Sequence, residues 1–222
     1  MTNFPSGFCK NVDNVAFYDV ITAAELEQLS IQAGVDNCCD LQSIIENIKQ
    51  AGSILEMGMG HGRVLKYLSS INYAGKVTGI EYCKNLITES YIPQNLDFAK
   101  IHADISKFNF TQQFDLILWR WSGICDFSQQ EQPLIIKKLA SLLSENGSLI
   151  IDTVSEALHP IGSVMKNKRE HFLLLSNLEI KVYCPNEEEI TQYCLEANLQ
   201  SPQIINYITY KNRQRVTYVC KN

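Results

Sequence analysis

The fold of this chain is decided by one stretch, Ser53-Ile54-Leu55-Glu56-Met57-Gly58-Met59-Gly60-His61-Gly62-Arg63. It begins as a short apolar strand, passes through three alternating glycines and continues as a helix over residues 61–70. Glycine has no Cβ and adopts positive φ freely, so a ligand can approach the main chain closely here. The free N–H groups at the start of the helix also point toward a bound ligand. We therefore expect a ligand pocket built on this turn.

The size and charge of the chain describe an ordinary globular protein. Its 222 residues fit one domain, residues 1–222, and 45% of them are hydrophobic against 19% charged. The net charge of -5 argues against a protein whose main task is to bind a phosphate backbone. Nucleic acid is therefore not an expected partner.

The cysteines predict a reducing compartment and no metal site. The eight are Cys9, Cys38, Cys39, Cys83, Cys125, Cys184, Cys194 and Cys220. None form a C-x-x-C pair, and no histidine lies at ligand spacing from them. The sequence also lacks a secretory signal and an apolar run of roughly 18 residues. We expect a cytoplasmic protein with reduced thiols, several of them in the core, and no membrane contact.

The centre of the chain alternates between strands and helices. The strands are expected at residues 53–57, 76–82, 98–102, 114–119 and 148–152, and the helices at 61–70, 84–91 and 129–143. Residues 145–147 are expected to turn the chain into the fifth strand. Because these strands are continuous apolar runs, we expect a parallel sheet covered on both faces.

The two ends of the chain depart from this alternation. Residues 1–40 form a leader, with a helix from the capping box at Thr22 to about residue 32, where Gly34 stops it. Asp40 is expected to cap a second helix that ends at Gly52. Residues 154–176 have no clear period, and 178–183 form an added strand. A helix starts after Asn186, and residues 203–210 and 214–220 form a β-hairpin.

The glycine turn alone leaves two ligand types open. A dinucleotide site has the spacing G-x-G-x-x-G, whereas here the glycines alternate and Glu56 stands two residues before the first. Glu81 ends the second strand, where its carboxylate can accept both hydroxyls of a ribose. A dinucleotide enzyme also uses an acid at this place, so Glu81 does not decide between the two.

With its acidic residue, the motif Glu56-x-Gly58-x-Gly60-x-Gly62 resembles the first motif of the class I S-adenosylmethionine-dependent methyltransferases. The resemblance covers the chain from about Asp40 to its end. It implies an α/β fold: a doubly wound, mostly parallel seven-stranded sheet with a C-terminal antiparallel hairpin, a helical leader and a small insertion after strand five. A dinucleotide fold would end in parallel strands instead.

The resemblance also implies a cofactor site for S-adenosyl-L-methionine. Main-chain groups around Glu56, Gly58 and Gly60 would contact its methionine part. The remaining cofactor contacts are Glu81 on the ribose, Tyr82 on the adenine face, Asp104 on the adenine amine, Ile105 through its N–H, and Trp119 over the methionine. For Asp104 the other interpretation is a helix cap or turn residue.

Substrate contacts are expected from three places. Arg120 and Trp121 follow the fourth strand, Tyr18 comes from the leader acting as a lid, and His159 lies in residues 154–185, the expected substrate cover. We assign no catalytic residue, because the sulfonium is already activated and a base is needed only when the nucleophile must lose a proton. The chain also lacks the Asn/Asp-Pro-Pro-aromatic motif of enzymes that methylate adenine or glutamine amino groups.

The resulting hypothesis is an enzyme of the EC 2.1.1 class that methylates an O, N or C nucleophile of a small molecule and releases S-adenosyl-L-homocysteine. The alternatives are methylation of protein or RNA, and a non-catalytic adenosyl-cofactor-binding subunit. An aminopropyl-transferring relative would carry paired acids where Trp119-Arg120-Trp121 stands. The acceptor, and whether the protein is a monomer or a homodimer, stay open.

Overall fold

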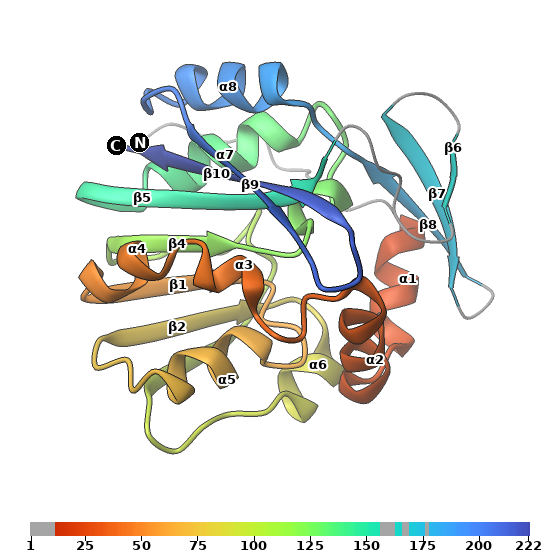
Figure 1. The fold of residues 1–222 in the computed structure, drawn as a ribbon, viewed down its shortest axis with the longest axis horizontal. Helices are drawn as coiled ribbons and strands as arrows, with labels where there is room; N and C mark the ends of the chain where they lie inside the picture. The colour runs from red at the N-terminus through yellow and green to blue at the C-terminus, as the bar shows by residue number, and fades with distance from the viewer. Residues whose placement is uncertain (1–11, 156–162, 166–168, 176–177) are drawn as a thin grey trace.

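A seven-stranded sheet runs through the structure, a computed structural model that describes residues 12–155, 163–165, 169–175 and 178–222 (Figure 1). The strand order is β3-β2-β1-β4-β5-β10-β9. The strands are β1 Ser53–Met57, β2 Lys76–Glu81, β3 Asp97–His102, β4 Phe114–Trp119, β5 Leu143–Val154, β9 Gln203–Ile208 and β10 Gln214–Lys221. The first five are parallel, and β10 lies antiparallel between β5 and β9. The predicted fold class is confirmed.

Helices cover both faces of this sheet. One face packs against α3 Cys39–Gln42, α4 Ile45–Gln50 and α5 Arg63–Ser70, and the other against α7 Gln132–Ala140 and α8 Glu187–Glu196 (Figure 1). The described cysteines are free thiols, and six of the seven are buried. No helix in the described part of the chain is long and apolar enough to cross a membrane.

A third group of elements lies beyond the carboxyl ends of the parallel strands (Figure 1). It contains α1 Val12–Val20, α2 Ala23–Ala33, α6 Lys84–Glu89 and a small antiparallel sheet of β6 Ser163–Met165, β7 Glu170–Leu175 and β8 Leu178–Tyr183. The side chain of Asn14 joins α1 to β8, because it donates to the carbonyl of Lys181 and accepts from its N–H, both at 2.8 Å. The leader and the insertion therefore hold one another.

Local sequence signals place several elements correctly. The capping boxes at Thr22 and Asn186 are both formed, and Gly34 ends α2 with a φ of 74°. The insertion after β5, in contrast, has more structure than the sequence indicated. Only 178–183 was expected as a strand, but β6 and β7 precede it. The helix α1 was not expected either.

The predicted role of Asp40 as a helix cap is wrong. The segment forms two short helices, α3 and α4, and the residue at the N-cap of α3 is Cys38, with a φ of 60°. The Asp40 carboxylate is instead fully buried and bound to Arg63 and Arg120. Charge-assisted bonds to two guanidinium groups outweigh the weaker bond to a helix N–H.

The predicted turn at residues 145–147 is also wrong, since these residues belong to β5. The pairing of β4 with β5 shifts at this point, from Phe114 opposite Leu143 to Leu116 opposite Ser148. Asp115 accepts the hydroxyl of Ser144 at 2.8 Å. Between these two pairs β5 has more residues than β4, and the additional residues form an irregularity in the strand instead of a turn before it.

The three glycines of the β1–α5 turn differ in the space that is available for a side chain. Gly58, Gly60 and Gly62 all have positive φ, at 67°, 53° and 86°. A Cβ built on Gly62 would lie 2.4 Å from the carbonyl oxygen of Tyr91, whereas a Cβ on Gly58 would meet nothing within 4 Å. The third glycine is therefore required by packing, and the first leaves open space for a ligand.

Gly62→Ala should consequently lower the free energy of unfolding more than Gly58→Ala. We expect losses of about 3 kcal/mol at Gly62, where backbone must move, and about 1 kcal/mol at Gly58, where only the positive φ is unfavourable. Urea unfolding of both variants measures the difference. Equal losses would contradict the steric distinction between the two positions.

Candidate functional site

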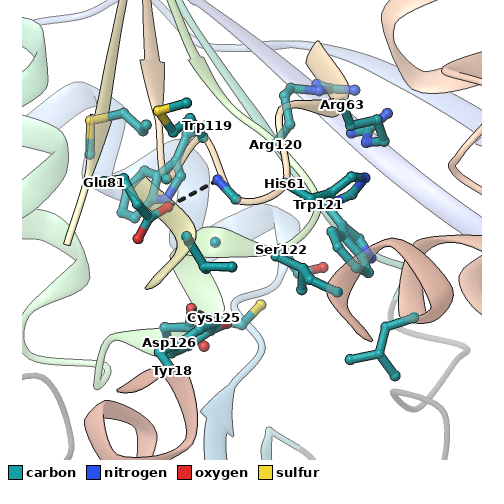
Figure 2. A pocket seen from close by; sticks show the side chains of 18 of the residues that line it. Tyr18, His61, Arg63, Glu81, Trp119, Arg120, Trp121, Ser122, Cys125 and Asp126 are labelled. Atoms are coloured by element: carbon teal, nitrogen blue, oxygen red, sulfur yellow. Dashed lines mark hydrogen bonds between the residues drawn. The ribbon is translucent and has the colours of Figure 1, made fainter. Parts of the chain in front are cut away.

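A cavity of about 430 Å³ opens at the carboxyl ends of the parallel strands (Figure 2). Its walls come from the glycine turn, the ends of β2 and β4, the helices α1 and α2, the strand β8 and the β9–β10 hairpin. Ligands of open α/β sheets bind at this edge. The sequence predicted the edge and the turn, with the leader as a lid and residues 154–185 as a cover, and the parts of these two segments that line the cavity are α1, α2 and β8.

The turn and β2 are fixed to each other by Glu81. One carboxylate oxygen accepts from the N–H of Gly60 and the other from the N–H of Cys83, each at 2.9 Å (Figure 2). Both oxygens keep a further lone pair, because an ionised carboxylate offers about four acceptor positions. Glu81 lines the cavity, so it can accept two additional hydroxyls from a ligand held there.

Glu56 places a second carboxyl group in the cavity wall. It is 3% exposed, and its Oε2 has no hydrogen-bond partner among the described residues. Burial raises its pKa well above the usual value, Glu81 adds to the shift, and Arg63 opposes it. A buried polar atom without a partner indicates a missing donor. A ligand ammonium would supply that donor and restore the ionised form.

The predicted adenine residues are only partly at the cavity. Tyr82 and Ile105 line it, together with Ala103. Asp104 is not among the lining residues. Its Oδ1 accepts the N–H and the hydroxyl of Ser106 at 2.8 and 2.7 Å, and its Oδ2 lies 3.6 Å from Lys107 Nζ. The structure thus shows Asp104 as a turn residue, the other interpretation of this position.

The exit of β4 bends sharply into the cavity. Trp119 is buried and packs edge-on against Phe127, with ring centroids 5.5 Å apart. Trp121 and Ser122 follow with φ of 49° and 61°, a conformation that costs each residue about 1 kcal/mol or more. The bend brings Trp121 to the ring of His61, at 6.4 Å between centroids (Figure 2). Both tryptophans line the cavity.

The leader reaches the cavity through Tyr18. Its hydroxyl donates to Asp126 Oδ2 at 2.9 Å, and both residues line the cavity (Figure 2). Burial, followed by the charge and the hydrogen bond of Asp126, raises the pKa of Tyr18 well above its usual value. The tyrosine therefore stays protonated and acts as a donor. His159, the third predicted substrate residue, lies outside the described residues.

A buried ion cluster supports this side of the cavity, and the sequence did not predict it as a unit. Arg63 binds Asp40 through two bonds of 2.7 and 2.9 Å, and Arg120 Nε binds the same carboxylate at 3.2 Å. Arg120 Nη2 also donates to Thr217 at 3.1 Å and lies 3.8 Å from Asp152. The guanidinium of Arg120, predicted to meet substrate, is thus committed mainly to this cluster.

The cluster continues from Asp152 to the C-terminal hairpin. Arg215 Nη2 donates to Asp152, and Tyr207 donates to the same carboxylate at 2.6 Å. Burial opposes ionisation of Asp40, but the charges of Arg63 and Arg120 hold the pKa of this carboxyl well below its usual range. Asp152 and Arg215 are charged residues inside apolar strands, which was the available signal, but the sequence does not say which charged residues meet.

The chain has the class I, Rossmann-like methyltransferase fold, with the cavity at the strand edge that carries the glycine turn. Residues 54–147 match the family model described as a methyltransferase domain. The predicted resemblance to the S-adenosylmethionine-dependent family is confirmed. No curated protein matches this chain.

Solved structures of the same fold span most of the chain. An S-adenosylmethionine-dependent methyltransferase from Clostridium acetobutylicum has 16% identity and a TM-score of 0.68, covering 89% of this chain and 96% of its own. The 1,6-didemethyltoxoflavin-N1-methyltransferase of Burkholderia thailandensis has 10% identity and a TM-score of 0.66, covering 100% and 93%. The magnesium protoporphyrin IX methyltransferase of Synechocystis has 12% identity and a TM-score of 0.66, covering 99% and 100%.

Asp40→Asn should destabilise the protein by about 3–5 kcal/mol, because it leaves two buried guanidinium groups without their shared counter-charge. Urea unfolding measures the loss. The matched control is Asp97→Asn, which makes the same change at an exposed position on β3 and should stay within about 0.5 kcal/mol of the parent. A loss of less than 1 kcal/mol at Asp40 would contradict the role given to the cluster.

His61 should give a pH dependence of stability. Burial, followed by the charge of Arg63, lowers the pKa of His61 to about 4 from an ordinary 6.5. Between these values the unfolded chain binds a proton that the folded chain does not, so stability falls as the pH drops. This residue should contribute a loss of about 2 kcal/mol between pH 7 and pH 5.

Unfolding experiments at both pH values test this effect. His61→Gln should remove that part of the pH dependence, whereas His102→Gln, at an exposed position, should keep it. An unchanged dependence in His61→Gln would show that another group carries it.

Proposed function

We propose that this chain transfers a methyl group from S-adenosyl-L-methionine to an O, N or C nucleophile of a small molecule. One observation carries the proposal. The glycine turn leaves open space at Gly58, and it lies between a fixed acceptor, Glu81, and a buried carboxyl without a partner, Glu56. A ribose and an ammonium match these two groups, and the cofactor contains both.

Each cofactor contact follows from the position of a side chain. Glu56 would meet the ammonium, and Glu81 the two ribose hydroxyls, while Trp119 would cover the methionine. Tyr82 and the N–H of Ile105 would face the adenine. We propose Asp104 for the adenine amine only if ligand binding releases it from Ser106. The Burkholderia and Synechocystis enzymes were solved with bound S-adenosylhomocysteine and S-adenosylmethionine, respectively, which supports the choice of cofactor for this fold.

Bound S-adenosylmethionine would supply a methyl group on an activated sulfonium. What the chain must do is hold the nucleophile near that methyl, in line with the bond that breaks, and keep water out. Apolar side chains of the cavity wall exclude water: Phe17, Leu26, Leu29, Phe127, Ile180 and Val182. Tyr18 and Asp126 provide a hydroxyl donor and a carboxylate that can orient the acceptor. We assign no base, because only an acceptor that must lose a proton needs one.

A small-molecule acceptor fits a covered cavity better than a macromolecule does. The helices α1 and α2 and the strand β8 all contribute to the wall, so a bulky protein or RNA segment would have to displace them. Another solved structure of this fold is an amino pentose methyltransferase from Micromonospora echinaspora, whose acceptor is a small molecule. Free thiols support a cytoplasmic location within the same proposal. A monomer or a homodimer would serve this function equally.

Calorimetry with S-adenosylmethionine, S-adenosylhomocysteine and NAD tests the proposal directly. We expect both adenosyl ligands to bind and NAD not to bind. Glu81→Gln should weaken S-adenosylhomocysteine binding about 100-fold, because charge-assisted hydrogen bonds to the ribose are lost. The matched control is Glu145→Gln, an exposed position at the opposite end of the sheet, which should leave the affinity unchanged. Tight NAD binding without any response to the adenosyl ligands would reject the proposed cofactor.

A further inference from the structure

One wall of the cavity contains two arginines and a serine to which no cofactor contact is assigned. Arg213 and Arg215 come from the β9–β10 hairpin, and Ser122 comes from the bend after β4. All three residues line the cavity. We call these three residues the hairpin wall. They reach the cavity from the last and the middle parts of the chain, far in sequence from the glycine turn.

Arg213 is a half-buried arginine without a counter-charge. Its backbone is fixed, since its N–H donates to Thr209 Oγ1 at 3.2 Å and its carbonyl accepts from the Thr209 N–H. Its guanidinium makes no hydrogen bond or ion pair within the described residues. A guanidinium held at a cavity wall with its donors unused is a ready site for an anion.

Arg215 adds a second donor from a buried position. It is 5% exposed, its Nε donates to Tyr207 at 3.1 Å, and its Nη2 donates to Asp152 and to Ser122 Oγ, the latter at 2.8 Å. Its Nη1 has no hydrogen bond within the described residues. Because Ser122 Oγ already accepts from Arg215, its own hydrogen is left to donate. The wall thus presents donors only.

The charges behind the wall do not cancel. The buried cluster joins three guanidinium groups, Arg63, Arg120 and Arg215, to two carboxylates, Asp40 and Asp152, which leaves a surplus of one positive charge (3 − 2 = 1). Arg120 Nη1 is also buried without a partner among the described residues. A buried surplus of positive charge makes the local electrostatic potential more positive and favours an anion in the adjoining cavity.

The acidic groups of the cavity lie elsewhere. Glu56 lies near the end of β1 and Glu81 at the end of β2, and Asp126 is bound to Tyr18. We propose that the methyl acceptor carries a carboxylate, and that Arg213 binds it together with Arg215 Nη1 and the Ser122 hydroxyl. A guanidinium fork meets both oxygens of a carboxylate. The inference rests on the proposed function, because it names the acceptor class of that site.

Two matched probes test this assignment in protein saturated with S-adenosylhomocysteine. Phenylacetate and phenylacetamide differ in the charge and little in shape. The two tryptophans of the chain, Trp119 and Trp121, both line the cavity, so tryptophan fluorescence reports binding. We expect phenylacetate to bind at least about ten-fold more tightly than the amide, as a charge-assisted pair requires.

Three variants identify the groups responsible. Arg213→Gln should abolish the preference for the acid and leave the affinities for the amide and for S-adenosylhomocysteine unchanged. Ser122→Ala should weaken phenylacetate binding about three-fold. The matched control is Lys211→Gln, which removes a charge from the same hairpin outside the cavity lining and should keep the full preference.

Three outcomes would overturn the proposal. They are equal affinity for acid and amide, no saturable binding of phenylacetate, and a loss of S-adenosylhomocysteine affinity in Arg213→Gln as large as the loss for phenylacetate. The last result would assign the hairpin wall to the carboxylate of the cofactor. Failure of the parent protein to bind S-adenosylhomocysteine would instead reject the proposed function itself, so the two failures are distinguishable.

Discussion

The carboxylate of Asp40, bound between the guanidinium groups of Arg63 and Arg120, is the interaction on which the rest of the site depends. It ties α3 to the first turn of α5 and to the exit of β4. Through Arg120 the same cluster reaches Thr217 on β10 and Asp152 on β5. Removing these charges from water is expensive, and the cost is offset only when the partners lie in bonding geometry. The cluster therefore fixes the relative positions of the elements that form the cavity.

Much of the fold could be predicted because its signals are local. Continuous apolar runs mark β1, β2 and β4, and the boxes at Thr22 and Asn186 mark the starts of α2 and α8. The failures have a common cause in contacts between distant residues. Asp40 does not cap a helix, because its carboxylate binds Arg63 and Arg120, which are distant in the sequence. The packing of α1 follows from Asn14 bonding to Lys181, far away in the chain. Hydrophobic periodicity compares residues that are close in sequence, so it gives no information about partners that are distant in the chain.

Some residues of the site could also be predicted from local sequence, whereas others depend on contacts between distant parts of the chain. The predictions for Glu56 and Glu81 rest on their spacing to the glycines, because a strand, a tight turn and a helix fix where such residues lie, and both residues line the cavity. The sequence could not show that Asp104 would be bound by Ser106. The roles of Arg213 and Arg215 were equally hidden. The sequence predicts a hairpin around both residues, but their position at the cavity depends on β10 being inserted between β5 and β9.

The residues proposed to bind the cofactor and those proposed to bind the acceptor come from different parts of the chain. The proposed cofactor contacts come from the end of β1 and the glycine turn, the end of β2, the loop after β3 and the end of β4, which lie within one continuous half of the chain. The acceptor side is assembled from α1, β8, the bend at Ser122 and the hairpin, which meet only in the folded protein. The two sides share the ion cluster, but Arg213 stands outside it. A change at Arg213 can therefore alter the choice of acceptor while the buried charges, and with them the cofactor side, stay in place.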